Sequence, residues 1–293
     1  MSSWEGKSRG TPLGYRIFVW ILRNFGVYPA YFLLRFVTVY FFLFSFKTTK
    51  PTYFLYRNKL GYSVARSVLM VYRNFFILGQ GIIDKVVVMS GIKNRFTYHF
   101  DGEQNIRDMV AGGKGGMLLS AHIGNWDIAG HLLKRIDTVI NIVIFDAEHA
   151  EIKAYLDGVT GRKSVRLIVI KNDLSHIYAI NDAFQNNELV CMHADRFLEG
   201  NKTITADFLG ETAKFPIGPF VLAAKFKVPV SYVFAVKESM LHYHFFSSKP
   251  VDYSVFPKNE MAPAMAKDFV AEMETKLRVY PEQWFNYYNF WAK

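Results

Sequence analysis

Two patterns of hydrophobic positions meet near residue 90 of the chain. Much of the first fifty residues is apolar, and Gly26 and Pro29 mark a break followed by a residue suited to the first turn of a new helix. This pattern predicts two helices, over residues 13–25 and 28–46. A further apolar stretch over 63–89, with charged residues spaced along it, predicts one or two helices packed beneath the first pair.

From about residue 91, short β-rich runs alternate with helix-like segments. The runs that predict strands are residues 117–121, 139–145, 166–170, 188–193, 228–236 and 241–247. The segments that predict helices are residues 103–112, 125–134, 148–160, 173–186, 215–226 and 261–279. This alternation is typical of an α/β fold, with a mixed, partly parallel sheet flanked by helices and an antiparallel pair at 228–247. We therefore predict a helical region over 1–90 and an α/β domain over 91–293.

The helix predicted at 28–46 is about long enough to cross a hydrocarbon core of ~30 Å. Arg35 lies inside it, and a mid-helix arginine is disfavoured by about 2.5–3.5 kcal/mol on insertion scales. A shallow or interfacial placement therefore competes with a clean span, and burial of the helices in a soluble core is a third alternative. A cleavable signal peptide is disfavoured, because the stretch is too long, is broken by Arg and Pro, and lacks a following small-residue cleavage site.

Composition and charge narrow the choice. The 293 residues are 51% hydrophobic, 17% aromatic and 20% charged, which excludes a disordered chain and a collagenous repeat. The single cysteine, Cys191, excludes an internal disulfide and suits a reducing compartment. The net charge of +10 divides into +12 over residues 1–100 and −2 over the remainder. Because bulky apolar residues separate the basic ones, an anionic membrane surface is favoured over nucleic acid.

The candidate chemistry follows the strand predicted at 117–121, where His122-Ile-Gly-Asn-Trp-Asp127 leads into a helix-like segment. Five α-helical residues would place the His and Asp side chains about 140° apart, so the pair requires His122 on a turn and Asp127 in the first helical turn. Gly124 loosens such a turn, and Asn125 is a good N-cap. The carboxyl end of a strand is also where open α/β sheets bind ligands. A capping and packing role for His122 is the alternative to catalysis.

A His-x4-Asp/Glu block after a strand resembles the signature of glycerolipid and lysophospholipid acyltransferases. The sequence His122-Ile-Gly-Asn-Trp-Asp127 is similar to the corresponding block of the lauroyl and myristoyl transferases, the late acyltransferases of lipid A biosynthesis. The further matches follow in the order of that family: Gly161-Arg162, Cys191–Asp195, Phe208–Gly210, Phe215–Pro219, Val221–Ala224, Val228-Pro229 and Pro281–Phe285. The chain departs from the family in three places. Asp127 stands where Glu is common, and Asp195-Arg196 stands where Asp-Gln is usual. After Trp284, residues 285–291 read Phe-Asn-Tyr-Tyr-Asn-Phe-Trp where the family usually carries His, Arg and Lys residues.

The resemblance implies acyl transfer from a thioester to a hydroxyl. His122 has an unperturbed pKa near 6.5 and would act as the general base, while Asp127 would hydrogen-bond the other ring nitrogen and fix the tautomer. The acceptor hydroxyl is itself the nucleophile, so no covalent enzyme intermediate is required. No Gly-x-Ser-x-Gly elbow occurs, which disfavours an α/β-hydrolase.

Three further residues are implied in substrate binding. Asn125 would stabilise the oxyanion that forms on the thioester carbonyl. Arg162, with Arg166 as its competitor, would hold a phosphate or the phosphopantetheine of the donor. Asp195 would position Arg162 or a hydroxyl, or else cap the next turn. We predict no metal and no cofactor, since the remaining histidines show no metal-ligand spacing along the chain.

The implied partners are acyl carrier protein as the donor, ahead of coenzyme A, and a membrane lipid as the acceptor. A lipid A precursor is the acceptor that the family suggests, and the altered C-terminus leaves an amino-acid lipid or an aryl polyene lipid as alternatives. A catalytically idle lipid-binding protein is the alternative of a different class. The expected location is the cytoplasmic face of a bacterial inner membrane, with the basic surface holding the enzyme on anionic lipid.

Overall fold

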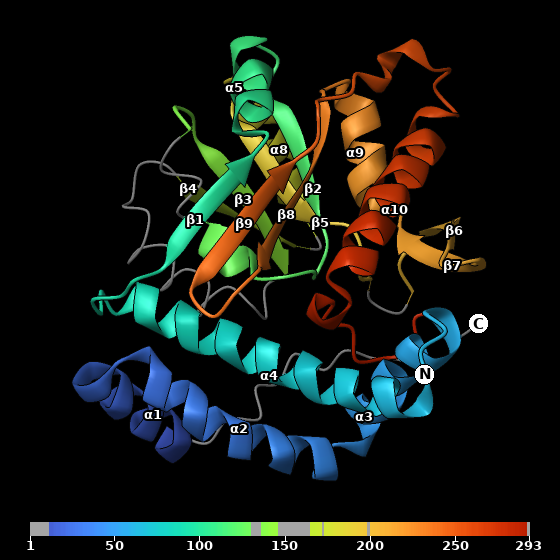
Figure 1. Cartoon of the computed structure of the whole chain (residues 1–293). Coiled ribbons are helices and arrows are strands. Elements are labelled where there is room, and N and C mark those ends of the chain that lie inside the picture. Colours follow the sequence, from blue (N-terminus) through green and yellow to red (C-terminus); the bar gives the residue numbers. More distant parts are fainter. Residues whose placement is uncertain (1–11, 130–135, 146–164, 172, 198–199, 292–293) are drawn as a thin grey trace.

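A computed structural model describes residues 12–129, 136–145, 165–171, 173–197 and 200–291. In this part of the chain, a seven-stranded sheet carries helices on both faces, and long N-terminal helices lie beneath it (Figure 1). The helices are α1 (Pro12–Phe25), α2 (Val27–Phe44), α3 (Phe46–Phe54), α4 (Val64–Met89), α5 (Glu103–Ala111), α8 (Ser175–Gln185), α9 (Gly218–Phe226) and α10 (Met261–Val279). Shorter turns are the π-helical η1 (Leu55–Lys59) and the 3₁₀ turns η2 (Trp126–Ala129), η4 (Tyr253–Val255) and η5 (Pro281–Gln283).

The main sheet has the order β1-β9-β8-β2-β5-β3-β4, and all neighbours are parallel except β8 and β9. Its strands are β1 (Thr97–Asp101), β2 (Gly116–Ser120), β3 (Ile140–Phe145), β4 (Val165–Ile170), β5 (Leu189–His193), β8 (Val230–Lys237) and β9 (His242–Ser247). A separate antiparallel hairpin consists of β6 (Thr203–Phe208) and β7 (Glu211–Pro216). The predicted fold class and the antiparallel pair at 228–247 are therefore confirmed.

Successive residues of the central strands pack into two different hydrophobic cores, one on each face of the sheet. On β2, Met117 and Leu119 belong to the core that α8, α9 and α10 cover. Leu118 faces the opposite core, together with residues of α2, α4 and α5. All three side chains are buried, as expected for a strand covered on both faces. The central strand that precedes His122 is thereby fixed from both sides.

The local pattern missed three strands. β1 is an edge strand in which exposed and half-buried positions alternate. β6 and β7 carry charged residues such as Asp207, Glu211 and Lys214, which interrupt any apolar run. The helix predicted at 125–134 is only the 3₁₀ turn η2 within the described residues, and the helix predicted at 148–160 lies outside them.

The three N-terminal helical predictions correspond to α1, α2 and α4, and the segment 63–89 forms one helix. α2 packs against α4 and buries Ala30, Tyr31 and Leu34. Its other side is exposed, including Phe32 and Phe36. Among the described residues, α2 alone passes a test of length and apolar composition for a membrane-crossing helix, and a single such helix is weak evidence of a span. The domain boundary near residue 90 stays a prediction.

Candidate active site

The register of two neighbouring parallel strands brings His122 and Asp195 together. Ser120 at the end of β2 lies opposite His193 at the end of β5, and each of the two functional side chains follows two residues later. The amide of Ala194 donates to the carbonyl of Ser120 at 2.9 Å, which extends the pairing past the strand ends. The site therefore lies at the carboxyl edge of the sheet, where open α/β folds bind ligands.

Asp195 is a buried carboxylate with three donors around it. Its Oδ1 lies 2.7 Å from His122 Nδ1, and its Oδ2 accepts from the His122 backbone amide at 3.0 Å and from Trp284 Nε1 at 3.3 Å. Burial alone would raise the pKa of this carboxyl, but the charge and hydrogen bond of His122, together with Arg196, hold the pKa well below its usual range. Asp195 is therefore ionised at neutral pH.

The His122 ring is held in one orientation. Because the Asp195 carboxylate is ionised, Nδ1 carries the proton it donates, and Nε2 keeps its lone pair. Burial, and then the charge of Arg196, lower the pKa of His122, while Asp195 acts in the opposite direction. His193 stacks on the ring with centroids 4.4 Å apart, and burial lowers the pKa of His193 to about 3. A neutral imidazole with a free basic nitrogen is the form that a general base needs.

The turn after His122 depends on Gly124. Its φ is +74°, in the left-handed region that favours glycine. A Cβ there would lie 1.9 Å from the carbonyl oxygen of Ala235 on β8. The Gly124 amide donates to the carbonyl of Gln283, and the Phe285 amide donates to the carbonyl of His122. The C-terminal segment thus supports the turn directly.

Asn125 connects this turn to α4 and β9. Its side-chain amide donates to the carbonyl of Gly81 at 3.1 Å and to the Tyr243 hydroxyl at 3.4 Å. A Cβ at Gly81 would come within 3.3 Å of that amide, so the small residue permits the close approach. In the structure the side-chain amide of Asn125 is bonded to these two acceptors, so it holds the turn in place. Its role in stabilising the oxyanion stays a prediction.

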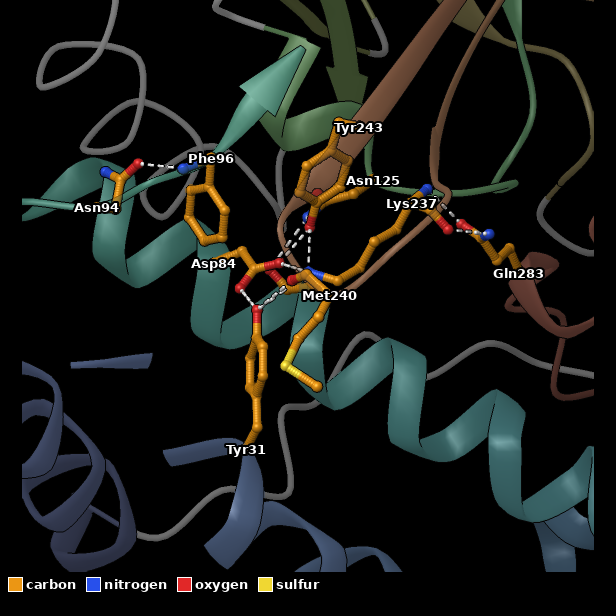
Figure 2. Close-up of polar contacts among 10 residues, drawn as sticks. Tyr31, Asp84, Asn94, Phe96, Asn125, Lys237, Met240, Tyr243 and Gln283 are labelled. Carbon is orange, nitrogen blue, oxygen red and sulfur yellow. Dashed lines mark hydrogen bonds and ion pairs between the residues drawn. The ribbon is translucent and has the colours of Figure 1, made fainter. Parts of the chain in front are cut away.

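A buried polar cluster lies next to Asn125 (Figure 2). Asp84 of α4 contacts Lys237 Nζ of β8 and the hydroxyls of Tyr31 and Tyr243. Desolvation dominates both charged groups, raising the pKa of Asp84 and lowering that of Lys237. We call Tyr31, Asp84, Lys237 and Tyr243 the Asp84 cluster. The cluster joins α2 and α4 to strands β8 and β9 of the main sheet. It does so through the buried Asp84–Lys237 ion pair and the two tyrosine hydroxyls.

The other predicted site residues have different outcomes. The backbone of Asp127 lies in η2, directly after the turn, and its side chain is outside the described residues. Arg162 also lies outside them. Arg166 lies near the start of β4 and pairs with Glu188 at 2.8 Å, so it is at the amino edge of the sheet, opposite His122. The proposed competition between the two arginines is therefore not supported for Arg166.

Sequence reasoning missed Arg196 and Trp284 as parts of the site. The Arg196 guanidinium bonds to the carbonyl of Phe285, while its buried Nε has no hydrogen-bond partner among the residues that the structure describes. Its charge acts on both His122 and Asp195. The departure from Asp-Gln to Asp195-Arg196 was the available signal, because it places a cation beside the pair.

Comparisons with known proteins give three findings. The chain is 29% identical over 128 residues to the phosphatidylinositol mannoside acyltransferase of Mycobacterium tuberculosis strain ATCC 25618 / H37Rv, and equally to that of strain CDC 1551 / Oshkosh. These matches cover 42% of this chain and only 39% of each relative's length. The crystal structure of the 1-acyl-sn-glycerophosphate (LPA) acyltransferase PlsC from Thermotoga maritima gives a TM-score of 0.41 at 14% identity, over 84% of this chain and 95% of that one.

The third finding covers most of the chain. Residues 66–293 match the family described as bacterial lipid A biosynthesis acyltransferase. The matched region includes the turn with His122, the Asp195 block and the C-terminal segment that supports them. The chain therefore belongs to the bacterial lipid A biosynthesis acyltransferase family.

Proposed function

We propose that the protein is a membrane-associated O-acyltransferase that moves a fatty acyl chain from acyl carrier protein to a hydroxyl of a lipid, with a lipid A precursor as the acceptor. The observation that carries the proposal is the neutral His122 imidazole, oriented by the ionised Asp195 carboxylate at the carboxyl edge of the sheet. Membership of the family supplies the class of reaction.

The reaction follows from the free nitrogen of His122. Nε2 removes the proton of the acceptor hydroxyl while that oxygen attacks the thioester carbonyl. The tetrahedral intermediate collapses, the carbon–sulfur bond breaks, and the imidazolium returns its proton to the leaving thiolate. The products are an ester and a free thiol, and the enzyme is regenerated without a covalent intermediate.

Asp195 has the properties of the carboxylate partner in this scheme. It keeps the proton on Nδ1 before the reaction and stabilises the imidazolium during it. Asp127 remains the partner that the sequence resemblance suggests. The two assignments predict different effects of Asp195→Asn and Asp127→Asn on the pH dependence of acyl transfer.

Arg196 is our further candidate for binding an anionic substrate group. Its guanidinium is half-buried beside the His122–Asp195 pair, and within the described part of the chain its Nε has no hydrogen-bond partner. A guanidinium suits a phosphate, whether on the donor's phosphopantetheine or on the lipid. Arg162 keeps the same role as a proposal from the resemblance.

The outward face of α1 and α2 supports membrane attachment. Its exposed large apolar side chains are Ile17, Trp20, Phe25, Tyr28, Phe32, Phe36, Val39, Tyr40, Leu43 and Phe44. An exposed apolar face of this extent is typical of a lipid contact, and basic side chains such as Arg16, Arg23 and Arg35 are also exposed there. Because the opposite side of α2 packs on α4, which contacts the catalytic sheet, we propose that α2 lies along the bilayer interface at the cytoplasmic face of the inner membrane.

Lipid profiling of a deletion strain by mass spectrometry tests the function. We expect the strain to lack one acyl chain on lipid A, and we expect a plasmid carrying wild-type protein, but not His122→Ala, to restore it. Intact lipid A together with an underacylated second lipid would refute the proposed acceptor. Unchanged acylation of all lipids would refute acyl transfer itself. Assays of the purified protein with acyl carrier protein or coenzyme A thioesters then identify the donor.

A further inference from the structure

A second cluster of histidines and carboxylates lies on the edge strand β1 and its neighbour β9, outside the active site. β1 and β9 are parallel, and their register places His99 directly opposite His244. Asp101 lies two residues farther along β1, so its side chain is on the same face of the sheet as His99. His244 is far from His99 and Asp101 in the sequence, so the spacing along the chain gave no sign of a metal site.

The three side chains converge on a small volume. His99 Nε2 lies 3.5 Å from Asp101 Oδ1, and His244 Nε2 lies 3.2 Å from Asp101 Oδ2. One ligand atom of each residue lies within 4.8 Å of the others. Two ligand atoms that are each ~2.0–2.1 Å from a tetrahedral zinc ion lie ~3.3 Å apart, so only small side-chain rotations are needed to enclose an ion.

A carboxylate behind His244 orients its ring. His244 Nδ1 lies 2.8 Å from Glu238 Oε1, and the Tyr280 hydroxyl donates to the same oxygen at 2.6 Å. A proton held on Nδ1 by Glu238 leaves Nε2 as the ligand atom, directed toward Asp101. Histidines that bind metals regularly have such a carboxylate on the second nitrogen. The ring is also stacked on Phe246, with centroids 3.9 Å apart.

We propose that His99, Asp101 and His244 bind one divalent transition-metal ion of the zinc type, with Glu238 orienting His244. Two imidazole nitrogens and one carboxylate select such an ion over Mg²⁺, which prefers oxygen ligands in octahedral geometry. The two carboxylates give the surroundings a negative charge, which Lys276, over the Phe246 ring, offsets in part. The ion would link the edge strand β1 to its neighbour β9.

Zinc binding by the purified full chain in detergent tests the proposal. The chain, without tag histidines and after chelator treatment, is dialysed against Zn²⁺ in the presence of excess Mg²⁺, and bound metal is counted by elemental analysis. The key variants are His99→Ala and Asp101→Asn, whose side chains are 59% and 61% exposed, so their replacement leaves the fold intact. His176→Ala is the matched control, since His176 lies on α8 and outside the cluster.

The active site must be distinguished from this cluster, because His122, His193 and Asp195 also have ligand atoms within 4.8 Å of one another. His193→Asn is therefore included, and only metal binding is measured on it. We expect one zinc ion per chain in wild type, His176→Ala and His193→Asn, and its loss in His99→Ala and Asp101→Asn. We also expect Zn²⁺ to raise the unfolding temperature of wild type but not of His99→Ala. Absence of zinc binding in wild type, its retention in His99→Ala, or its loss only in His193→Asn would overturn the proposal.

Discussion

Replacement of His122 by alanine is expected to lower kcat/KM for acyl transfer by about 10²–10⁴-fold, the usual contribution of a general base. The variant loses the nitrogen that accepts the hydroxyl proton, and the lipid hydroxyl is a weak nucleophile while it keeps that proton. The measurement is the rate of thiol release from the acyl donor, with purified protein and lipid acceptor in mixed micelles.

The matched control is His176→Ala, which removes an imidazole from α8 and should leave kcat/KM unchanged. Membrane binding of His122→Ala should match that of wild type, and the variant should stay folded. The His122 main chain still holds the turn, and the buried Asp195 carboxylate keeps its hydrogen bonds from the backbone amide of residue 122 and from Trp284. Full acyl transfer by a folded His122→Ala protein would be incompatible with the proposed mechanism.

Breaking the buried ion pair between Asp84 and Lys237 is expected to lower the stability of the fold strongly. Asp84→Asn is expected to lower the free energy of unfolding by about 3–5 kcal/mol, because it leaves the Lys237 ammonium buried without its counter-charge. The amide is nearly isosteric with the carboxylate, so no cavity contributes to the loss. Chemical denaturation of the purified protein in detergent, followed by circular dichroism, gives the difference.

Two comparisons show whether charge burial is the cause. Asp84→Leu combined with Lys237→Met removes both charges at similar volume and should recover most of the stability. Arg278→Gln breaks an exposed ion pair with Glu274 on α10 and should cost no more than about 0.5 kcal/mol. A loss in Asp84→Asn as small as that in Arg278→Gln would show that the buried pair does not hold α4 to the sheet.

The sequence was sufficient to predict the elements on which the site is built. The strand before His122 and the strand before Asp195 were both predicted to within about a residue, since each is a short buried apolar run between polar turns. The left-handed turn at Gly124 was also predictable, because glycine is favoured there.

The pairing of those strands was not predictable from local pattern. The sequences of the two strands do not reveal that β2 lies beside β5. This adjacency is what brings Asp195 to His122. The same holds for Asp84, which in the sequence is a lone acid in an apolar segment. Its partner Lys237 lies 153 residues away and meets it only when α4 packs under the sheet.

The pH profile of kcat/KM for Asp195→Asn shows whether Asp195 orients His122 as the base. Burial and Arg196 lower the pKa of His122 from 6.5, so wild-type kcat/KM should fall on the acid side only below pH 6.5. Asp195→Asn should lose about 10²–10⁴-fold in kcat/KM, as expected when a histidine base loses its orienting carboxylate. Its acid limb should move to lower pH, because the carboxylate that raises the pKa of His122 is gone.

Asp127→Asn, measured in parallel, decides between the two carboxylates. We predict that the shift of the acid limb occurs in Asp195→Asn and not in Asp127→Asn, since Asp195 is the carboxylate in contact with His122 Nδ1. Wild-type kcat/KM and an unmoved acid limb in Asp195→Asn would show that Asp195 does not orient His122 as the base.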